Sequence, residues 1–270
     1  MHVVASENFW GSIAAQLGGD RVRVTSIVTR PDTDPHTYEA TPADARAVAT
    51  ARYVIVNGVG YDAWANRLAQ AGSRSDRSVL DVGESVGVKA GANPHLWYSP
   101  AVVHRVVDRI TADYERLDPA DDGYFARQRA AFLAGGLGTY DAAIGDIKAR
   151  FGGTPIGASE SIVEPIATAL GLDLVTPATF LRSVSEGGDP TAADKSTVDA
   201  QIAEHRIRVY VVNSQNSTPD VQAEVARARA SHVPVVSFTE TLTPPGATFQ
   251  DWQVGQLHAL ADALSQGAGR

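Results

Sequence analysis

The chain has no cysteine among its 270 residues. Disulfide bonds, iron–sulfur clusters, thiolate nucleophiles and cysteine-type zinc sites are therefore excluded, and any metal ion must be held by nitrogen and oxygen ligands. Long apolar runs are also missing, because a stretch such as 209–212 is far shorter than the roughly 18 residues that a membrane-spanning helix needs. The chain opens almost directly into a strand-like run without a basic leader, which indicates a mature or trimmed form.

Basic residues are fewer than acidic residues. The sequence carries 23 Lys and Arg against 31 Asp and Glu, a formal net charge of −8. Because this charge repels a phosphate backbone, we expect no nucleic acid partner, and its sign suits a small cationic ligand better. The remaining composition is that of a globular protein with 44% hydrophobic residues, and the length corresponds to about two domains of roughly 150 residues.

Short apolar runs alternate with longer helical patterns, which is typical of α/β proteins with parallel sheets. Four strands are predicted in each half, so we expect two lobes, each with a mostly parallel four-stranded sheet flanked by helices. The predicted strands cover residues 3–5, 21–28, 53–57, 79–82, 154–158, 172–176, 207–213 and 233–238. The two halves show no sequence similarity strong enough to indicate a repeat.

A stretch without strand signals separates the two blocks. One amphipathic helix is predicted for residues 100–117 and a second for 119–151, which at 1.5 Å per residue would be about 50 Å long and could connect two lobes. Gly135, Gly136 and Gly138 are expected to bend or break this second helix, or to admit another backbone. The expected organisation is an N-terminal lobe of residues 1–118, a connecting helix of 119–151 and a C-terminal lobe of 152–270.

Two of the seven histidines, His36 and His95, lie in loops that follow predicted strands, where open α/β sheets bind ligands. Each follows a proline, which stiffens its loop and leaves the imidazole little entropy to lose on binding. This favours preorganised ligation, while a locally hydrogen-bonded turn histidine stays the alternative for either loop alone. Asp32 and Asp34 beside His36 are candidate acceptors that fix its tautomer, or simply turn residues.

Two carboxylates stand at equivalent places in the second half. Glu160 follows the strand predicted for 154–158, and Glu240 follows the strand predicted for 233–238. Two imidazoles and two carboxylates would match the charge of a divalent cation and suit manganese, zinc or ferrous iron. The alternatives are a first-turn helix acid at Glu160 and a surface acid at Glu240.

Other histidines give weaker signals. His104 and Asp108 stand one helical turn apart, but Arg105 and Arg109 beside them favour a solvated helix face over a metal pair. No role is assigned to His2, His205, His232 or His258.

The segment Gly58-Val59-Gly60 follows a predicted strand, and Asp81 comes about 20 residues later, which approximates a dinucleotide-binding fingerprint. Only about ten helical residues fit before Gly72, so a tight turn that feeds a helix explains these glycines better. A nucleotide-linked oxidoreductase built on this segment stays an alternative.

The two histidine loops resemble those of the metal-binding solute-binding proteins of bacterial ABC importers for manganese and zinc, the cluster A-I or TroA-like family, and the likeness spans nearly the whole chain. Members carry Pro-His-x-Tyr-Glu and Asn/Asp-Pro-His-x-Trp loops, which correspond here to residues 35–39 and 93–97. The family has two α/β lobes joined by one long helix, with the metal between them. The resemblance implies the metal ligands His36, His95, Glu160 and Glu240, with no catalytic residue.

The resemblance also bears on the metal. Glu160 stands in a Ser-Glu setting like that of manganese-type members, whereas Glu240 replaces the usual aspartate, so that its extra methylene could alter its reach or leave water in the shell. The histidine-rich loop of many zinc-type members is absent between Tyr61 and Asn93. We expect one divalent ion, Mn²⁺ or Zn²⁺, with Fe²⁺ as a further candidate.

The implied function is that of an extracytoplasmic receptor, not an enzyme, that captures one ion between two lobes and delivers it to an ABC permease. We expect a monomer in the periplasm or on the cell surface as a lipoprotein, with its signal or anchor segment outside this chain. The main alternative is a metal-dependent hydrolase that uses Glu160 or Glu240 as general base. An adhesin role is also associated with the family, and no residue here speaks for or against it.

Overall fold

The computed structural model describes residues 1–30, 38–71 and 74–268, and the chain divides into two compact units. Unit 1 consists of Met1–Gly138 and Thr241–Trp252. Unit 2 consists of Thr139–Glu240 and the chain from Gln253 onward. Each unit is therefore assembled from two stretches of sequence that lie far apart along the chain.

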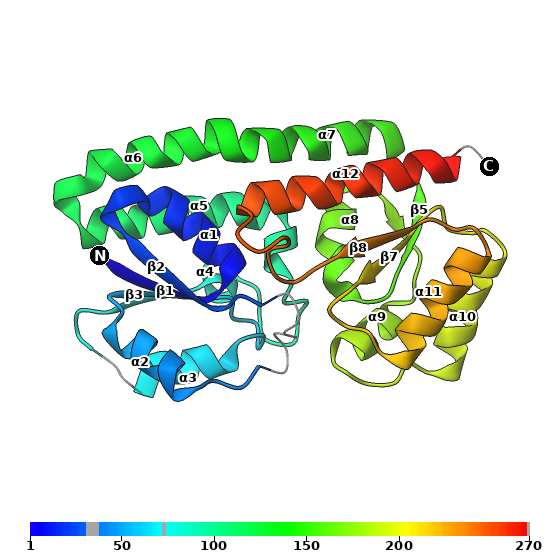
Figure 1. The fold of residues 1–270 in the computed structure, drawn as a ribbon, viewed down its shortest axis with the longest axis horizontal. Helices are drawn as coiled ribbons and strands as arrows, with labels where there is room; N and C mark the ends of the chain where they lie inside the picture. The colour runs from blue at the N-terminus through cyan, green and yellow to red at the C-terminus, as the bar shows by residue number, and fades with distance from the viewer. Residues whose placement is uncertain (31–37, 72–73, 269–270) are drawn as a thin grey trace. The chain divides into compact units, whose positions relative to one another are not determined.

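Unit 1 is built on a parallel sheet with the strand order β2-β1-β3-β4 (Figure 1). Its strands are β1 (His2–Glu7), β2 (Arg23–Val28), β3 (Tyr53–Val56) and β4 (Ser78–Asp81). The central strands β1 and β3 are buried almost throughout. The apolar runs at residues 3–5 of β1 and 53–56 of β3 are what a parallel sheet covered on both faces requires.

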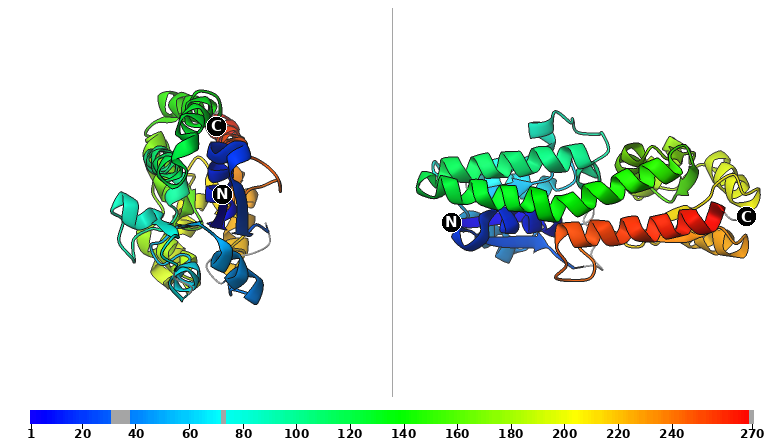
Figure 2. Two further views of the ribbon diagram at one scale, coloured as in Figure 1. Left: turned by 90° about the vertical axis from the view of Figure 1, so that its left-hand side faces the viewer. Right: turned by 90° about the horizontal axis from the view of Figure 1, so that it is seen from above.

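Helices cover both faces of this sheet. The helices are α1 (Asn8–Gly18), α2 (Pro42–Thr50), α3 (Ala63–Ala71), α4 (Val82–Val86), α5 (Pro100–Leu117) and α6 (Asp122–Ala131). In Figure 1, α1 and α5 lie on one face and α2 and α3 on the other. Figure 2 shows α6 running alongside α5, against which it packs. The predicted apolar stripe of α5, which includes Val103, Val107 and Ile110, is buried.

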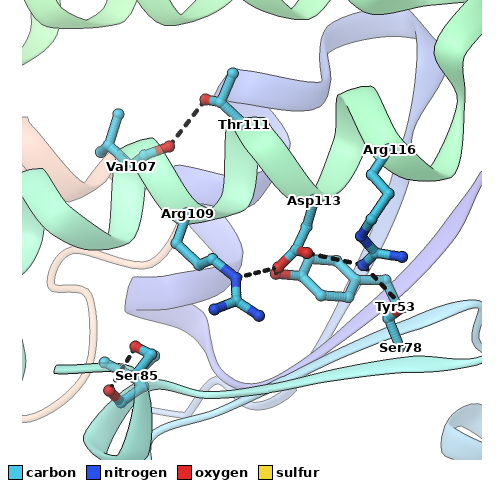
Figure 3. A network of polar contacts seen from close by, with 9 residues as sticks. Tyr53, Ser78, Ser85, Val107, Arg109, Thr111, Asp113 and Arg116 are labelled. Atoms are coloured by element: carbon cyan, nitrogen blue, oxygen red, sulfur yellow. Dashed lines mark hydrogen bonds and ion pairs between the residues drawn. The ribbon is translucent and has the colours of Figure 1, made fainter. Parts of the chain in front are cut away.

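A polar network anchors α5 to the sheet (Figure 3). The buried carboxylate of Asp113 accepts hydrogen bonds from the Tyr53 hydroxyl at 2.9 Å and from Arg109 and Arg116 at 2.8 Å each. Burial alone would raise the pKa of Asp113, but these hydrogen bonds from Arg116, Arg109 and Tyr53 outweigh it, so that the pKa lies below its ordinary value. The C-terminal half of α5 is therefore attached to β3 of the sheet.

Unit 2 repeats the arrangement with the strand order β6-β5-β7-β8, again all parallel. Its strands are β5 (Pro155–Ala158), β6 (Asp173–Leu174), β7 (Tyr210–Asn213) and β8 (Val235–Phe238). Its helices are α7 (Gly138–Phe151), α8 (Glu164–Leu170), α9 (Ala178–Ser185), α10 (Ala192–Ala203), α11 (Pro219–Ala230) and most of α12 (Phe249–Ala268). In Figure 1, α10 and α11 lie on one face of the sheet and α8 on the other.

The strand order places a topological switch point in each sheet. In both, the chain passes from the first strand to one neighbour and then returns to the opposite side, so the switch lies between β1 and β3 and between β5 and β7. Open α/β sheets bind their ligands beside this point, at the carboxyl ends of the strands. Each unit therefore has one edge where polar side chains are expected to serve function.

The three glycines do not break the long helix. Residues 132–137 form a π-helical segment, and α-helix continues on both sides, in α6 and α7. A side chain at Gly136 would contact the Phe132 ring at 3.0 Å, so the missing side chain makes room for that ring. π-Helix is rare in proteins and occurs mostly as such short segments within α-helices, which continue on both sides of it.

The predicted α/β fold, with two parallel four-stranded sheets, is confirmed, and each of the eight predicted strands overlaps an observed one. The ends differ. The strand predicted for 21–28 begins at Arg23 because residues 19–21 form a 3₁₀ turn, and the strand predicted for 172–176 shrinks to Asp173–Leu174. Among the described residues, no helix combines the length and apolar character that crossing a bilayer requires.

Candidate metal centre

Two buried carboxylates meet at the switch-point edge of unit 2. Glu160 comes two residues after β5 and Glu240 two residues after β8. Both residues are 1% exposed, and a carboxylate oxygen of one lies within 4.8 Å of a carboxylate oxygen of the other. The carboxyl ends of parallel strands share one edge of the sheet, which is why residues 80 positions apart come together.

Asn213, the last residue of β7, holds the two carboxylates together. Its amide nitrogen donates to Glu160 Oε1 at 2.6 Å and to Glu240 Oε1 at 2.7 Å. Its amide oxygen accepts the backbone N–H of Gln215 at 2.9 Å, which fixes the orientation of the amide. Asn216 adds a second donor to Glu160, at 2.9 Å from Oε2.

The charge of this pair is its most informative property. Two carboxylates that lie this close in a buried place repel each other when both are ionised, which makes burial of the pair costly. Amide donors stabilise carboxylates without neutralising them. A divalent cation bound by both would replace this repulsion with attraction, and carboxylate oxygens are suitable ligands for manganese, zinc and ferrous iron.

In unit 1, His95 lies in the loop between α4 and α5 and is fully buried. Asn93 Oδ1 accepts hydrogen bonds from the His95 backbone N–H at 3.0 Å and from ring atom Nδ1 at 2.8 Å. Because an amide oxygen can only accept, the proton of the neutral ring lies on Nδ1. The lone pair of the imidazole is then on Nε2, the arrangement that a metal-binding histidine needs.

The backbone of this loop is held from the sheet. Asn57, which follows β3, donates from its side-chain amide to the carbonyl of Pro94 at 2.9 Å and accepts the indole N–H of Trp10 at 3.1 Å. The rings of Tyr61 and Trp97 each pack edge-on against the His95 ring and are tilted against one another. The tautomer of the His95 imidazole is therefore fixed, the backbone of its loop is held in place, and its ring is packed between aromatic side chains.

A buried acid pair supports the same turn. The Ser6 hydroxyl lies 2.6 Å from Glu7 Oε2 and 2.5 Å from Asp62 Oδ2, and the backbone N–H groups of Asn57 and Gly58 donate to Asp62. Burial raises the pKa of Glu7 well above its ordinary value, and the neighbouring Asp62 raises it further. Burial also raises the pKa of Asp62, against the opposing hydrogen bonds from Ser6 and from the backbone of Gly58 and Asn57.

The four predicted ligands are thus distributed between the units. His95 belongs to unit 1, and Glu160 and Glu240 belong to unit 2, where their carboxylates converge. His36, together with Asp32 and Asp34, lies outside the described residues. The ligand set as a whole therefore stays a prediction.

The weaker candidates have structural explanations. Asp108 is exposed and forms an ion pair with Arg129, in agreement with a solvated helix face. Gly58 has φ +77, and Asp81 caps α4 by accepting the Glu84 backbone N–H at 2.9 Å. The segment Gly58-Val59-Gly60 is therefore a tight turn, and the Asp81 carboxylate serves the protein's own backbone.

The sequence reasoning missed the asparagines. It assigned no role to Asn57 or Asn213, and Asn93 appeared only as part of a motif. A signal was present, because Asn57 and Asn213 are polar residues at the carboxyl ends of two fully apolar strand patterns. Which groups they contact could not be deduced from that signal.

Comparison with known proteins identifies the family. A profile of zinc-uptake complex component A, periplasmic (ZnuA), matches residues 3–263. This chain belongs to the ZnuA family. Its relatives include the manganese-binding lipoprotein MntA of Halalkalibacterium halodurans, which is 30% identical over 138 residues, 49% of this chain and 45% of that protein. The matched stretch thus spans less than half the length of this curated relative.

Solved structures of the same fold cover almost the whole chain. A crystal structure of ZnuA superposes with a TM-score of 0.79 at 22% identity, over 97% of this chain and 98% of that one. A Mn-bound periplasmic metal binding protein from Candidatus Liberibacter asiaticus gives a TM-score of 0.77 at 19% identity, over 97% and 99% of the two chains. These likenesses confirm the fold expected for a ZnuA family member.

Proposed function

We propose that this protein captures one divalent transition metal ion outside the cytoplasm and delivers it to the membrane permease of an ABC importer. The observation that carries the proposal is the buried carboxylate pair, Glu160 and Glu240, held on the single amide of Asn213. Such a pair can provide two of the ligands of a cation site, and a bound cation would offset the free-energy cost of burying two ionised carboxylates.

The proposed ligands are His36 and His95 from unit 1 and Glu160 and Glu240 from unit 2. The Nδ1 hydrogen bond of His95 to Asn93 supports this assignment, because it leaves the Nε2 lone pair as the metal-binding atom. The two nitrogen and two oxygen donors suit Mn²⁺, Zn²⁺ or Fe²⁺. The relative named for manganese and the family named for zinc uptake favour the first two.

Binding is favoured over catalysis by the size of the ligand set. Four protein ligands leave little room for the activated water that a hydrolytic metal site keeps. The ion is then cargo, and no chemical step is performed on it. In relatives named as a lipoprotein and as periplasmic, the receptor lies outside the cytoplasm, and we place this protein there as a monomer that meets its permease at the membrane.

The ligand assignment is tested by metal titration. Protein stripped with a chelator is titrated with Mn²⁺ and with Zn²⁺ by calorimetry, and we expect one ion per chain. The variants His36→Ala, His95→Ala, Glu160→Gln and Glu240→Gln should each lose more than about 100-fold in affinity, beyond the typical effect of a group that only supports a ligand. Glu240→Asp should keep most of the affinity, because aspartate is the residue expected at this position from the family resemblance.

Matched controls separate ligand loss from general damage. His104→Ala, at a partly exposed position in α5, and Glu204→Gln, at the exposed position that follows α10, change the same residue types and should leave the affinity unchanged. Near-normal affinity in both His95→Ala and Glu160→Gln would reject the site. Delivery is tested separately by manganese or zinc uptake in cells that lack their own receptor, where the wild type should restore uptake and Glu160→Gln should not.

A further inference from the structure

The two units carry the same polar pair at their switch points. The same three residues, Ala-Ser-Glu, stand at the carboxyl end of the first strand of each unit: Ala5-Ser6-Glu7 closes β1, and Ala158 closes β5 and is followed by Ser159-Glu160. The register pairs Ala5 with Ile55 and Ala158 with Val211. Continued by two residues, it sets Glu7 opposite Asn57 and Glu160 opposite Asn213. The two asparagines therefore occupy the same place in the two sheets.

The side-chain amide of each asparagine donates to a metal-site element of its own unit, meaning the two carboxylates in unit 2 and the His95 loop in unit 1. Asn213 uses its two amide hydrogens on two different carboxylates, Glu160 and Glu240. Asn57 donates to the carbonyl of Pro94, the residue immediately before His95. Both residues are fully buried, so neither amide can exchange these partners for solvent.

The orientation of each amide is determined by its other contacts. Asn213 Oδ1 accepts from the Gln215 backbone, and the Asn213 backbone N–H donates to Ser159 Oγ at 3.0 Å. Asn57 Oδ1 accepts from Trp10. The donors of both amides therefore point to the metal-site elements and cannot rotate away without leaving a buried donor unsatisfied, which is unfavourable.

We propose that Asn57 and Asn213 are paired positioning residues that set the geometry of the metal site, Asn57 through the His95 loop and Asn213 through the two carboxylates. This inference rests on the proposed function and adds residues that act through the ligands. An amide suits the task because it donates without carrying charge. A lysine or arginine in the place of Asn213 would also hold both carboxylates, but its positive charge would neutralise them and compete with the incoming cation.

The proposal predicts a graded effect at Asn213. Asn213→Leu has nearly the same shape but no donor, so the two carboxylates repel and separate, and we expect Mn²⁺ affinity to fall about 10- to 100-fold, the range for lost supporting groups. Asn213→Ser offers one donor and should lose less. Asn57→Leu should also lower affinity, because the His95 loop loses its tie to β3. The control Asn66→Leu removes a partly buried amide that bonds Asp81 and none of the proposed ligands or their loop, and it should bind normally.

The readout must separate positioning from general destabilisation. Each variant is titrated with Mn²⁺, its melting temperature is measured without metal, and the visible absorption spectrum of the Co²⁺-loaded protein is recorded, because that spectrum reports coordination number and symmetry. A positioning role predicts that Asn213→Leu changes the Co²⁺ spectrum as well as the affinity. Reduced affinity with the wild-type spectrum would show a merely structural role and overturn the inference.

Failure of this inference differs from failure of the proposed function. If Glu160→Gln and Glu240→Gln lose binding while Asn213→Leu and Asn57→Leu stay within about twofold of wild type, the site stands and the positioning role is rejected. If the glutamate and His95 variants bind normally, the site itself is rejected, and the positioning role is rejected with it. If Asn213→Leu does not fold, Asn213→Ser with its intermediate loss and altered spectrum decides the question.

Discussion

Glu224 should make the stability of unit 2 fall as the pH rises through neutrality. Its carboxylate lies on α11, is 4% exposed and accepts a hydrogen bond from the hydroxyl of Tyr210 on β7. Burial raises the pKa of Glu224 from 4.5 to about 7, and Asp199 and Asp220 add to this rise against the opposing hydrogen bond from Tyr210. The folded protein therefore holds this proton more tightly than the unfolded chain does.

The sign and size follow from proton linkage. A raised pKa in the folded state contributes stability that is fully present below pH 4.5 and is lost as the pH rises through about 7. With these two pKa values, the contribution falls by about 2.5 kcal/mol between pH 5 and pH 8. Glu224→Gln keeps the shape and removes the proton, so the variant should lack this part of the pH dependence.

The assay is the melting temperature of wild type and Glu224→Gln at pH 5 and pH 8. The wild type should gain about 5–10 °C relative to the variant on going from pH 8 to pH 5, at about 2–4 °C per kcal/mol for a chain of this size class. Comparison with the variant removes the contribution of Glu7 and other titrating groups, which both proteins share. The surface variant Glu204→Gln should show no such pH-dependent gap. An equal gap between wild type and Glu224→Gln at both pH values would refute the reasoning.

Three further predictions concern stability. Asp113→Ala should destabilise unit 1 by about 2–3 kcal/mol in urea denaturation at pH 7, because the buried Tyr53 hydroxyl loses its acceptor while the half-exposed arginines lose little. The lowered pKa of Asp113 contributes stability that is lost as the pH falls below 3.8. The difference in unfolding free energy between wild type and variant should therefore be smaller in acid than at pH 7. Gly58→Ala should cost more than about 1 kcal/mol in the same assay, because φ is +77 and the new Cβ would lie 2.0 Å from an oxygen of Asp81; an unchanged midpoint would contradict the turn assignment. Trp252→Ala should lower the free energy of unfolding by about 3–5 kcal/mol, because removal of this buried ring leaves a cavity. A loss below about 1 kcal/mol would contradict this, since it would mean that the surrounding side chains fill the cavity.

Local patterns predicted much of the fold. The apolar run at 53–57 and the amphipathic spacing of 100–117 were sufficient for β3 and α5, because strand and helix formation depend on neighbours a few residues away. The same reasoning overestimated β6, whose two residues pair with β5 only over Pro155 and Ile156. It expected Gly135, Gly136 and Gly138 to bend or break the helix, or to admit another backbone, and the helix does not break there but continues through a π-segment. Both outcomes depend on packing against distant parts of the chain.

The sequence offered candidate ligands for the site but not the residues that support them. Proline-flanked histidines and glutamates that follow strands are visible as motifs, and of the four proposed ligands the structure brings Glu160 and Glu240 together. The role of Asn213 was not visible, because a lone asparagine at a strand end has many uses.

The sequence by itself determined the α/β architecture with its eight strands, the absence of thiolate chemistry and the nitrogen and oxygen donors available to a metal, since each of these depends on residue type or short-range pattern. Only the tertiary structure decided that Asn213 donates to Glu160, 53 residues away, and to Glu240, 27 residues away, and that Asn57 serves the His95 loop. The physical reason is that a hydrogen bond depends on position and direction in space, which for residues this far apart in the chain are set by how the strands align in the folded sheet.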